Sequence, residues 1–81
     1  MKQEEIWERL TQVFRSVFDE DVVIGPATTA KDIEGWDSLS NIELLVAIEK
    51  AFGGVKFNTG EIAKLRNVGE MVTIIAQRTA A

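Results

Sequence analysis

The residue best placed to do chemistry is Ser38, which follows Asp37 at the start of a run of apolar residues with helical spacing. Aspartate is a preferred N-cap, so the pattern predicts a helix over residues 38–52 with Ser38 in its first turn. The first amide groups of a helix lack partners, and the helix dipole is positive at that end. An exposed hydroxyl there could carry a negatively charged group, such as a phosphodiester, on a covalent tether.

A second chemistry for Ser38, nucleophilic hydrolysis, is excluded by what the chain lacks. The sequence contains no histidine and no cysteine, which removes the usual general base, thiol nucleophiles, disulfides and the commonest zinc ligands. The surrounding pentapeptide, GWDSL, is not the Gly-x-Ser-x-Gly motif of serine hydrolases. With 81 residues, the chain is also too short to build a deep enclosed active site.

The pair Asp37-Ser38 also has an interpretation that needs no chemistry. Aspartate and serine are common at helix starts because their side chains satisfy free backbone amides. The protein would then be a helical interaction adaptor without a cofactor. The short motif alone does not separate a tethering site from a capping site, so both interpretations stay open on this evidence.

The elements that would position Ser38 are helices. Residues 3–18 carry apolar side chains at spacings of three and four, which predicts a first amphipathic helix. Residues 19–36 hold the only proline and are expected to form a long loop, with Val22-Val23-Ile24 packed onto the core rather than in a strand. Glycines 53 and 54 are expected to end the helix over 38–52. Its expected apolar face comprises Leu39, Ile42, Leu45, Val46, Ile48 and Phe52.

Two further helices follow from cap signals. Asn58 with Glu61 predicts a short helix over 58–66, and Asn67 with Glu70 predicts a last helix over about 68–78. We therefore expect an all-α protein, a small four-helix bundle of three longer helices and one short one, with a single domain over residues 1–81. The residues expected to be buried in the last helix are Val68, Met71, Val72 and Ile75.

The charge distribution limits the classes of molecule that the protein could bind. The net charge is −4, which argues against nucleic acid, and it is uneven: residues 1–49 hold 11 acids and 4 bases. This acidic half is either a solvated surface or one that steers basic partners toward the protein. The sequence has no apolar run long enough to span a bilayer and no signal peptide at its start, so we expect no membrane insertion and a cytoplasmic location.

Residues 33–53, which read IEGWDSLSNIELLVAIEKAFG, resemble the carrier-protein superfamily and most closely the acyl carrier proteins. The shared features are Asp-Ser-Leu opening a helix, an apolar-Glu-Leu run, and acidic residues and Phe before a glycine turn. Helix order, loop placement, the later Phe57 loop and the total length agree as well, so the resemblance spans essentially the whole chain.

The resemblance implies that a phosphopantetheinyl transferase attaches a 4′-phosphopantetheine arm from coenzyme A to Ser38, next to the motif acid Asp37. The arm brings the thiol that the sequence lacks, and it holds an acyl chain as a thioester. The protein would be a monomeric, non-catalytic carrier that presents this group to acyl-loading and acyl-processing enzymes with basic docking patches. These enzymes would belong to fatty acid, polyketide or specialised lipid and secondary-metabolite pathways.

The resemblance also places partner contacts on the helix that begins at Ser38. Glu43 and Glu49 would join Asp37 as acidic contacts, with Leu39 and Ile42 as apolar ones. The alternatives are a solvated face for the two glutamates and core packing for the two apolar side chains. In the family the bundle interior can hold the acyl chain, and the matching lining would be Leu45, Val46, Ile62, Leu65, Met71 and Ile75.

Three residues depart from the pattern of fatty-acid-synthesis carriers. Ser40 and Lys50 stand where those carriers usually have acids, and Trp36 is more typical of specialised stand-alone carriers. These departures favour a dedicated pathway. A peptidyl or aminoacyl carrier is a further alternative, but such carriers more often show Gly-Gly-x-Ser, which this chain lacks.

Overall fold

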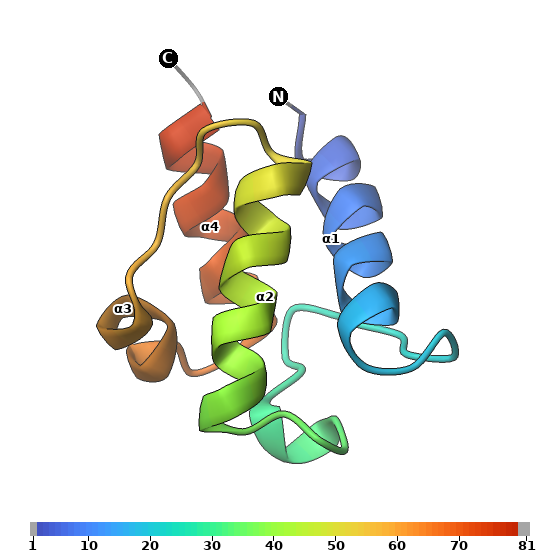
Figure 1. Ribbon diagram of the computed structural model, residues 1–81. Helices are drawn as coiled ribbons and strands as arrows, with labels where there is room; N and C mark the ends of the chain where they lie inside the picture. Colours follow the sequence, from blue (N-terminus) through green and yellow to red (C-terminus); the bar gives the residue numbers. More distant parts are fainter. Residues whose placement is uncertain (1, 80–81) are drawn as a thin grey trace.

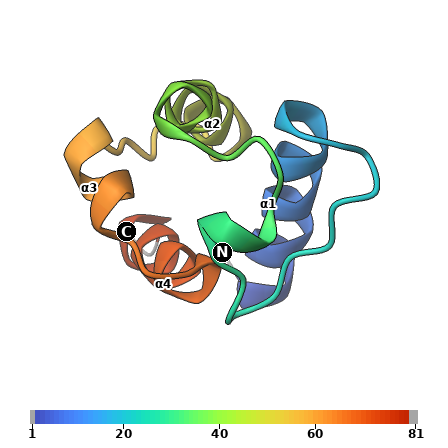
Figure 2. The same ribbon diagram turned by 90° about the horizontal axis from the view of Figure 1, so that it is seen from below.

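The computed structural model describes residues 2–79, apart from the side chain of Thr59, and helices are its only regular secondary structure within that range. Helix α1 spans Gln3–Val17, α2 Ser38–Ala51, α3 Thr59–Lys64 and α4 Val68–Thr79, and a single 3-10 turn, η1, covers Ala30–Asp32. The predicted order of three longer helices and one short helix is confirmed. Figure 1 shows α2 with α1 on one side and α3 on the other, and Figure 2, which looks along the bundle toward the end at which α2 begins, shows α2 and α4 on opposite sides of the bundle.

The core lies between the four helices, each of which contributes buried residues. Both α1 and α3 contact α2, and α1 also contacts α4. Four residues of α4 are buried as expected, namely Val68, Met71, Val72 and Ile75. The connection that precedes α3 contributes as well, since Val55 and Phe57 are buried there.

The buried face of α2 differs from the expected one. Leu44 and Ile48 are fully buried, and Phe52 follows them into the core. Leu39, Ile42 and Val46, which we assigned to the same face, are exposed instead. Almost every side of α2 carries apolar residues, so spacing alone does not fix which side meets α1.

The connection between α1 and α2 is a loop, as predicted, and it is fixed at both ends. The Arg15 Nε–H donates to the Val22 carbonyl over 3.0 Å, and the Val68 N–H donates to the Thr28 carbonyl over 2.8 Å. Val22 packs partly against the core, whereas Val23 faces solvent, so the packing expected for that segment is only partly correct.

One glycine lets this loop lie against α4. The Gly69 N–H donates to the Pro26 carbonyl over 3.0 Å, and a Cβ at position 69 would lie 2.7 Å from that same oxygen. No side chain fits in that space, so the first turn of α4 and the loop backbone touch directly. The first turn of α4 is thereby held against the loop that leads to Ser38.

Candidate functional site

Asp37 is the N-cap of α2, as the sequence predicted. Its Oδ1 accepts hydrogen bonds from the N–H groups of Leu39 and Ser40, each over 3.0 Å. The Ser40 Oγ accepts in return from the Asp37 N–H over 2.7 Å, which completes a reciprocal capping box. The hydrogen bond from the Ser40 N–H is the main cause that lowers the pKa of the Asp37 carboxyl, and the one from the Leu39 N–H has a smaller effect in the same direction. Desolvation acts in the opposite direction but is weaker than the effect of Ser40, so the carboxyl is ionised at neutral pH.

Ser38 and Ser40 stand two residues apart but differ in what their hydroxyls do. The Ser40 Oγ also donates to the Asp37 carbonyl over 3.1 Å, so it is engaged twice in the cap. Ser38 is the first residue of α2, is exposed, and its hydroxyl makes no hydrogen bond within residues 2–79. A group attached to Ser38 therefore breaks no interaction of the fold.

The helix start is less open to an anion than the sequence suggested. We expected unpaired amide groups around Ser38, but Asp37 already occupies those of Leu39 and Ser40. A phosphodiester on Ser38 would therefore share the positive end of α2 with an ionised carboxylate. The fit to a phosphate-bearing group thus rests on the accessible hydroxyl rather than on free amides.

Trp36 fixes the segment that leads into the site. Its indole stands edge-on to Phe14, with centroids 5.3 Å apart, and it lies 6.0 Å from Phe18. Its Nε1–H donates to the Asn41 side chain, one turn into α2. Gly35 precedes it with a φ of +88°, a conformation that favours glycine, so the chain turns sharply before the aromatic anchor.

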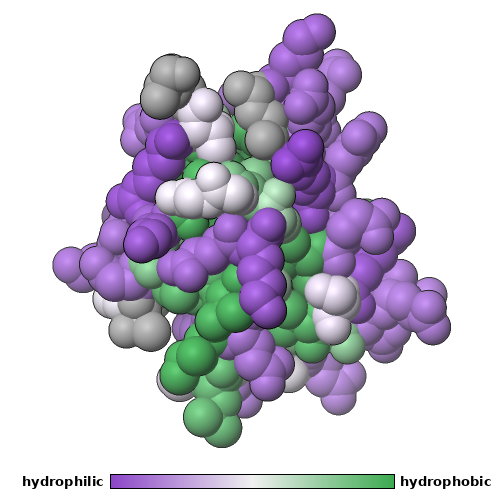
Figure 3. All heavy atoms as spheres, turned by 45° about the horizontal axis from the view of Figure 1, so that its top comes forward, coloured by the Kyte–Doolittle hydropathy of each residue, from purple (hydrophilic) through white to green (hydrophobic). Residues whose placement is uncertain are grey.

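The outer face of α2 carries an apolar stripe, by which we mean Leu39, Ile42 and Val46. These side chains are 78%, 51% and 43% exposed, and their spacing of three and four places them on one side of the helix. Figure 3 shows apolar surface running along the molecule between hydrophilic areas. Glu43 is exposed and Glu49 half-buried on the same helix. The core-packing alternative for Leu39 and Ile42 is therefore wrong.

Four acidic residues line a groove of about 430 Å³ between the end of α1 and the η1 region. Asp19, Asp21, Asp32 and Glu34 line it around the apolar side chains of Phe18, Val22, Val23 and Ile33. Within the described residues, no cluster of three or more acids could hold a metal ion. This surface adds negative charge beside the loop that leads to Ser38.

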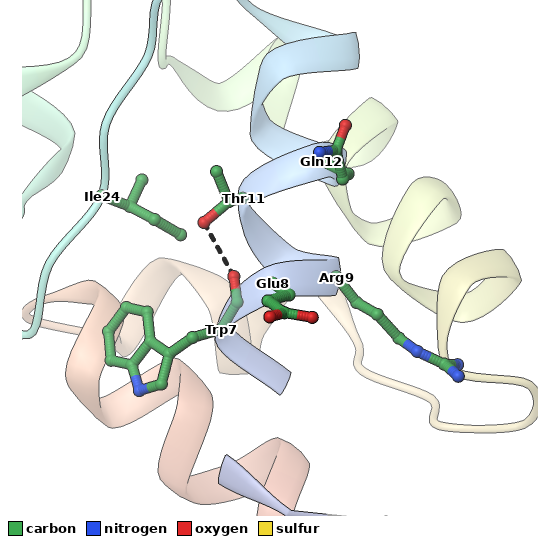
Figure 4. A pocket seen from close by; sticks show the side chains of 6 residues that line it. All are labelled: Trp7, Glu8, Arg9, Thr11, Gln12 and Ile24. Carbon is green, nitrogen blue, oxygen red and sulfur yellow. Dashed lines mark hydrogen bonds between the residues drawn. The ribbon is translucent and has the colours of Figure 1, made fainter. Parts of the chain in front are cut away.

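A second groove of about 520 Å³ lies outside α1, facing Ile24 of the long loop (Figure 4). Two of its polar side chains are engaged within the fold, because the Thr11 hydroxyl donates to the Trp7 carbonyl and the Arg9 guanidinium donates to the Ala51 carbonyl. No residue of the Asp37–Ser38 segment lines it, so it adds nothing to the site.

Of the residues expected to line an acyl-binding interior, Ile62, Met71 and Ile75 are buried and Leu45 and Leu65 are partly buried. Val46 is exposed on the outer face of α2 and does not belong to that lining. No described helix has the length and apolar character needed to cross a membrane.

Comparison with known proteins identifies the class of protein to which this chain belongs. The family model for a phosphopantetheine attachment site matches residues 8–75, most of the bundle and all of α2. Among curated proteins, the acyl carrier protein of Thermosynechococcus vestitus (strain NIES-2133 / IAM M-273 / BP-1) is 32% identical and that of Guillardia theta 31% identical, each alignment covering both chains completely. The solution NMR structure of the holo acyl carrier protein from Geobacter metallireducens superposes with a TM-score of 0.80 at 40% identity, covering 91% of this chain and 85% of that one.

The chain belongs to the acyl carrier protein family. The expected function, carriage of acyl groups, is confirmed, and so is the covalent 4′-phosphopantetheine cofactor. The exposed hydroxyl at the start of α2 fits such a group, and the arm, when attached, supplies the thiol that this cysteine-free chain lacks.

Proposed function

We propose that the phosphopantetheine arm is attached to Ser38. The observation that carries this assignment is the contrast between the two serines at the start of α2. The Ser38 hydroxyl is exposed and without a partner among the described residues, whereas the Ser40 hydroxyl bonds the Asp37 backbone twice. Attachment at Ser40 would abolish the hydrogen bond that its hydroxyl donates to the Asp37 carbonyl and would place a bulky group within the capping box, while attachment at Ser38 leaves the box intact.

In this proposal Asp37 and Trp36 are positioning residues. Asp37 fixes the residue at which α2 begins, and therefore holds Ser38 in the exposed first turn. Trp36 anchors the preceding loop to α1 through Phe14 and to α2 through Asn41. Neither residue needs to take part in bond formation, because a separate transferase performs the attachment. The protein acts as a non-catalytic carrier.

We propose that the partner enzymes dock on the apolar stripe and the acids beside it. Leu39 follows Ser38 directly, so an enzyme that covers this stripe also reaches the arm. Glu43 and Glu49 would then meet basic docking patches on the enzymes, and the net charge of −4 would speed the encounter. Lys50 ends the helix with an opposite charge. Together with Ser40, it supports partners of a dedicated pathway, for a polyketide, modified lipid or other secondary product.

Residues 1–81 form one carrier domain in this proposal, since a single core cluster draws on all four helices. The monomeric state, the cytoplasmic location and the absence of a nucleic-acid partner stay predictions from the sequence. Sedimentation of the purified protein would test the first of these.

The attachment site is tested by loading the protein with a broad-specificity phosphopantetheinyl transferase and coenzyme A, followed by intact-mass measurement. We expect a gain of one phosphopantetheinyl group for the unsubstituted chain and for Ser40→Ala, and none for Ser38→Ala. Circular dichroism of both variants shows that each is folded before loading. A gain in Ser38→Ala together with none in Ser40→Ala would overturn the assignment.

A further inference from the structure

A small recess of about 90 Å³ opens beside the start of α2, where the η1 turn, α2, α3 and the connection from α3 to α4 meet. Figure 2 looks toward this end of the bundle. The recess has an apolar side, formed mainly by Ile62, Ala63 and Leu65, and a polar side, formed by Asn41, Arg66 and Asn67 with the Trp36 indole.

The two asparagines that line the recess have unpaired donors, whereas their acceptors are engaged. The Asn41 Oδ1 accepts from the Trp36 indole N–H, and the Asn67 Oδ1 accepts from the Glu70 N–H over 2.9 Å. Each amide oxygen is therefore engaged, and each side-chain NH₂ group, which carries two donors, makes no hydrogen bond within residues 2–79.

Arg66 adds a free cation to the same side. The guanidinium groups of Arg9, Arg15 and Arg78 each bond a backbone carbonyl, and that of Arg78 also pairs with Glu61. The Arg66 guanidinium alone has no partner in the described part of the chain; the Glu70 carboxylate accepts from the Arg66 backbone N–H. No carboxylate lines the recess.

The polar side of the recess thus carries unpaired donors, although the net charge of the protein is −4. The recess also lies near Ser38, the proposed attachment residue. Asn41 is three residues after Ser38 on the same helix, a spacing that puts Cβ atoms about 5–6 Å apart. The volume is several times the about 10–15 Å³ that one water needs, so a group of a few heavy atoms enters and a long chain does not.

We propose that this recess binds the carboxylate of a short acyl group carried on the arm, so that the cargo is a short chain ending in an acid. The inference rests on the attachment of the arm to Ser38. Arg66 and the two asparagine amides hold the carboxylate through charge-assisted hydrogen bonds, which are stronger than neutral ones. The apolar wall contacts the methylene stem.

The test compares two thioesters on the same arm, succinyl and butanoyl, which share a two-methylene stem and end in a carboxylate and a methyl group. Mass spectrometry first confirms that the arm and then each acyl group have been added, so a failure of attachment is recognised before the recess is probed. NMR then follows the Arg66 Nε–H and the Asn41 and Asn67 NH₂ signals. We expect succinyl to shift all three relative to the unacylated arm and butanoyl to leave them unchanged.

A second readout is the loss of the acyl group in buffer without enzymes. The carboxylate of a free succinyl thioester attacks its own carbonyl carbon, the C–S bond breaks, the thiolate leaves and a cyclic anhydride forms. A carboxylate held by Arg66 does not reach that carbon, so we expect about 5-fold slower loss than from the free pantetheine thioester, allowing for the exposure of Arg66. The protection should disappear in Arg66→Ala and persist in Lys64→Ala, an exposed cation outside the recess.

Three results would overturn the inference. Equal shifts for succinyl and butanoyl would show that the carboxylate is not recognised. Shifts already complete on the unacylated arm would assign the recess to an amide carbonyl of the arm. Equal loss of protection in Lys64→Ala and Arg66→Ala would indicate a general charge effect rather than a site.

Discussion

The Trp36 indole stands edge-on to the Phe14 ring, with ring centroids 5.3 Å apart and the two planes at 78°. Phe14 is fully buried in α1, and Trp36 lies two residues before Ser38. This contact and the hydrogen bond from Trp36 to Asn41 attach the long loop to α1 and α2, the two helices that it connects. The position of the exposed serine thus depends on an aromatic contact with a helix that begins 35 residues earlier.

Replacement of Trp36 should loosen that loop in two steps. Trp36→Phe keeps an aromatic contact with Phe14 and loses the donor to Asn41, which we expect to cost about 1 kcal/mol. Trp36→Ala also loses the aromatic pair and buried area, for a total of about 3 kcal/mol. Urea unfolding measures both. Hydrogen exchange at residues 33–37 should rise in the same order, and equal stability of the two variants would contradict the role of the ring.

The Asp37 cap should give α2 a pH-dependent stability. Because hydrogen bonds lower the pKa of Asp37 in the folded state, its carboxylate stabilises the fold above the ordinary aspartate pKa. That contribution is lost as the pH falls through the lowered pKa. Asp37→Asn keeps an acceptor but does not titrate, so the Tm difference between the unsubstituted protein and this variant should shrink between pH 7 and about pH 2. A difference that is constant with pH would contradict the cap as described.

The apolar stripe and the core of α2 should respond differently to truncation. Leu39→Ala removes a side chain that is 78% exposed, so its unfolding free energy should change by no more than about 0.5 kcal/mol. Leu44→Ala opens a cavity at a fully buried position and should cost about 2–5 kcal/mol. If the stripe is the docking face, Leu39→Ala lowers the rate of transferase loading while its stability is unchanged. A loading rate equal to that of the unsubstituted protein would remove Leu39 from the interface.

Gly69 should be intolerant of even a methyl group. A Cβ there would lie 2.7 Å from the Pro26 carbonyl oxygen, so Gly69→Ala must push the loop away from α4, at a cost of about 1–3 kcal/mol. Gly25→Ala in the same loop is the matched control, because its Cβ would meet only the Thr28 Oγ1 at 3.9 Å. Thermal unfolding of the two variants compares them directly. Equal Tm values would show that the loop does not rest on α4.

The helices and their starts could be predicted because their signals are local. Asp37, Asn58 and Asn67 each accept from a backbone N–H in the first turn that follows, and that geometry depends only on neighbouring residues. The η1 turn carried such a signal too: Thr29 and Asp32 form a capping box whose three-residue spacing we did not use. The face that α2 buries could not be predicted, since apolar residues lie on almost all of its sides.

The site was predicted in type but not in detail. The motif pointed to Ser38, yet the contrast with Ser40 depends on which hydroxyl the cap engages, and two nearby serines look alike in a sequence. The set of donors in the recess could not be predicted either, because only the tertiary fold brings Asn41 of α2 next to Arg66 and Asn67 of the connection between α3 and α4. Likewise, nothing local to Gly69 indicates that Pro26 lies against it.

The most direct test of the central claim is to locate the arm on the unsubstituted protein. The chain is loaded with coenzyme A and a phosphopantetheinyl transferase, then fragmented in a mass spectrometer so that cleavages fall between Ser38 and Ser40. We predict that fragments ending at Ser38 or Leu39 carry the whole added mass and that those ending at Asp37 carry none. Added mass that first appears at Ser40, or no added mass under conditions that load another acyl carrier protein, would contradict the account.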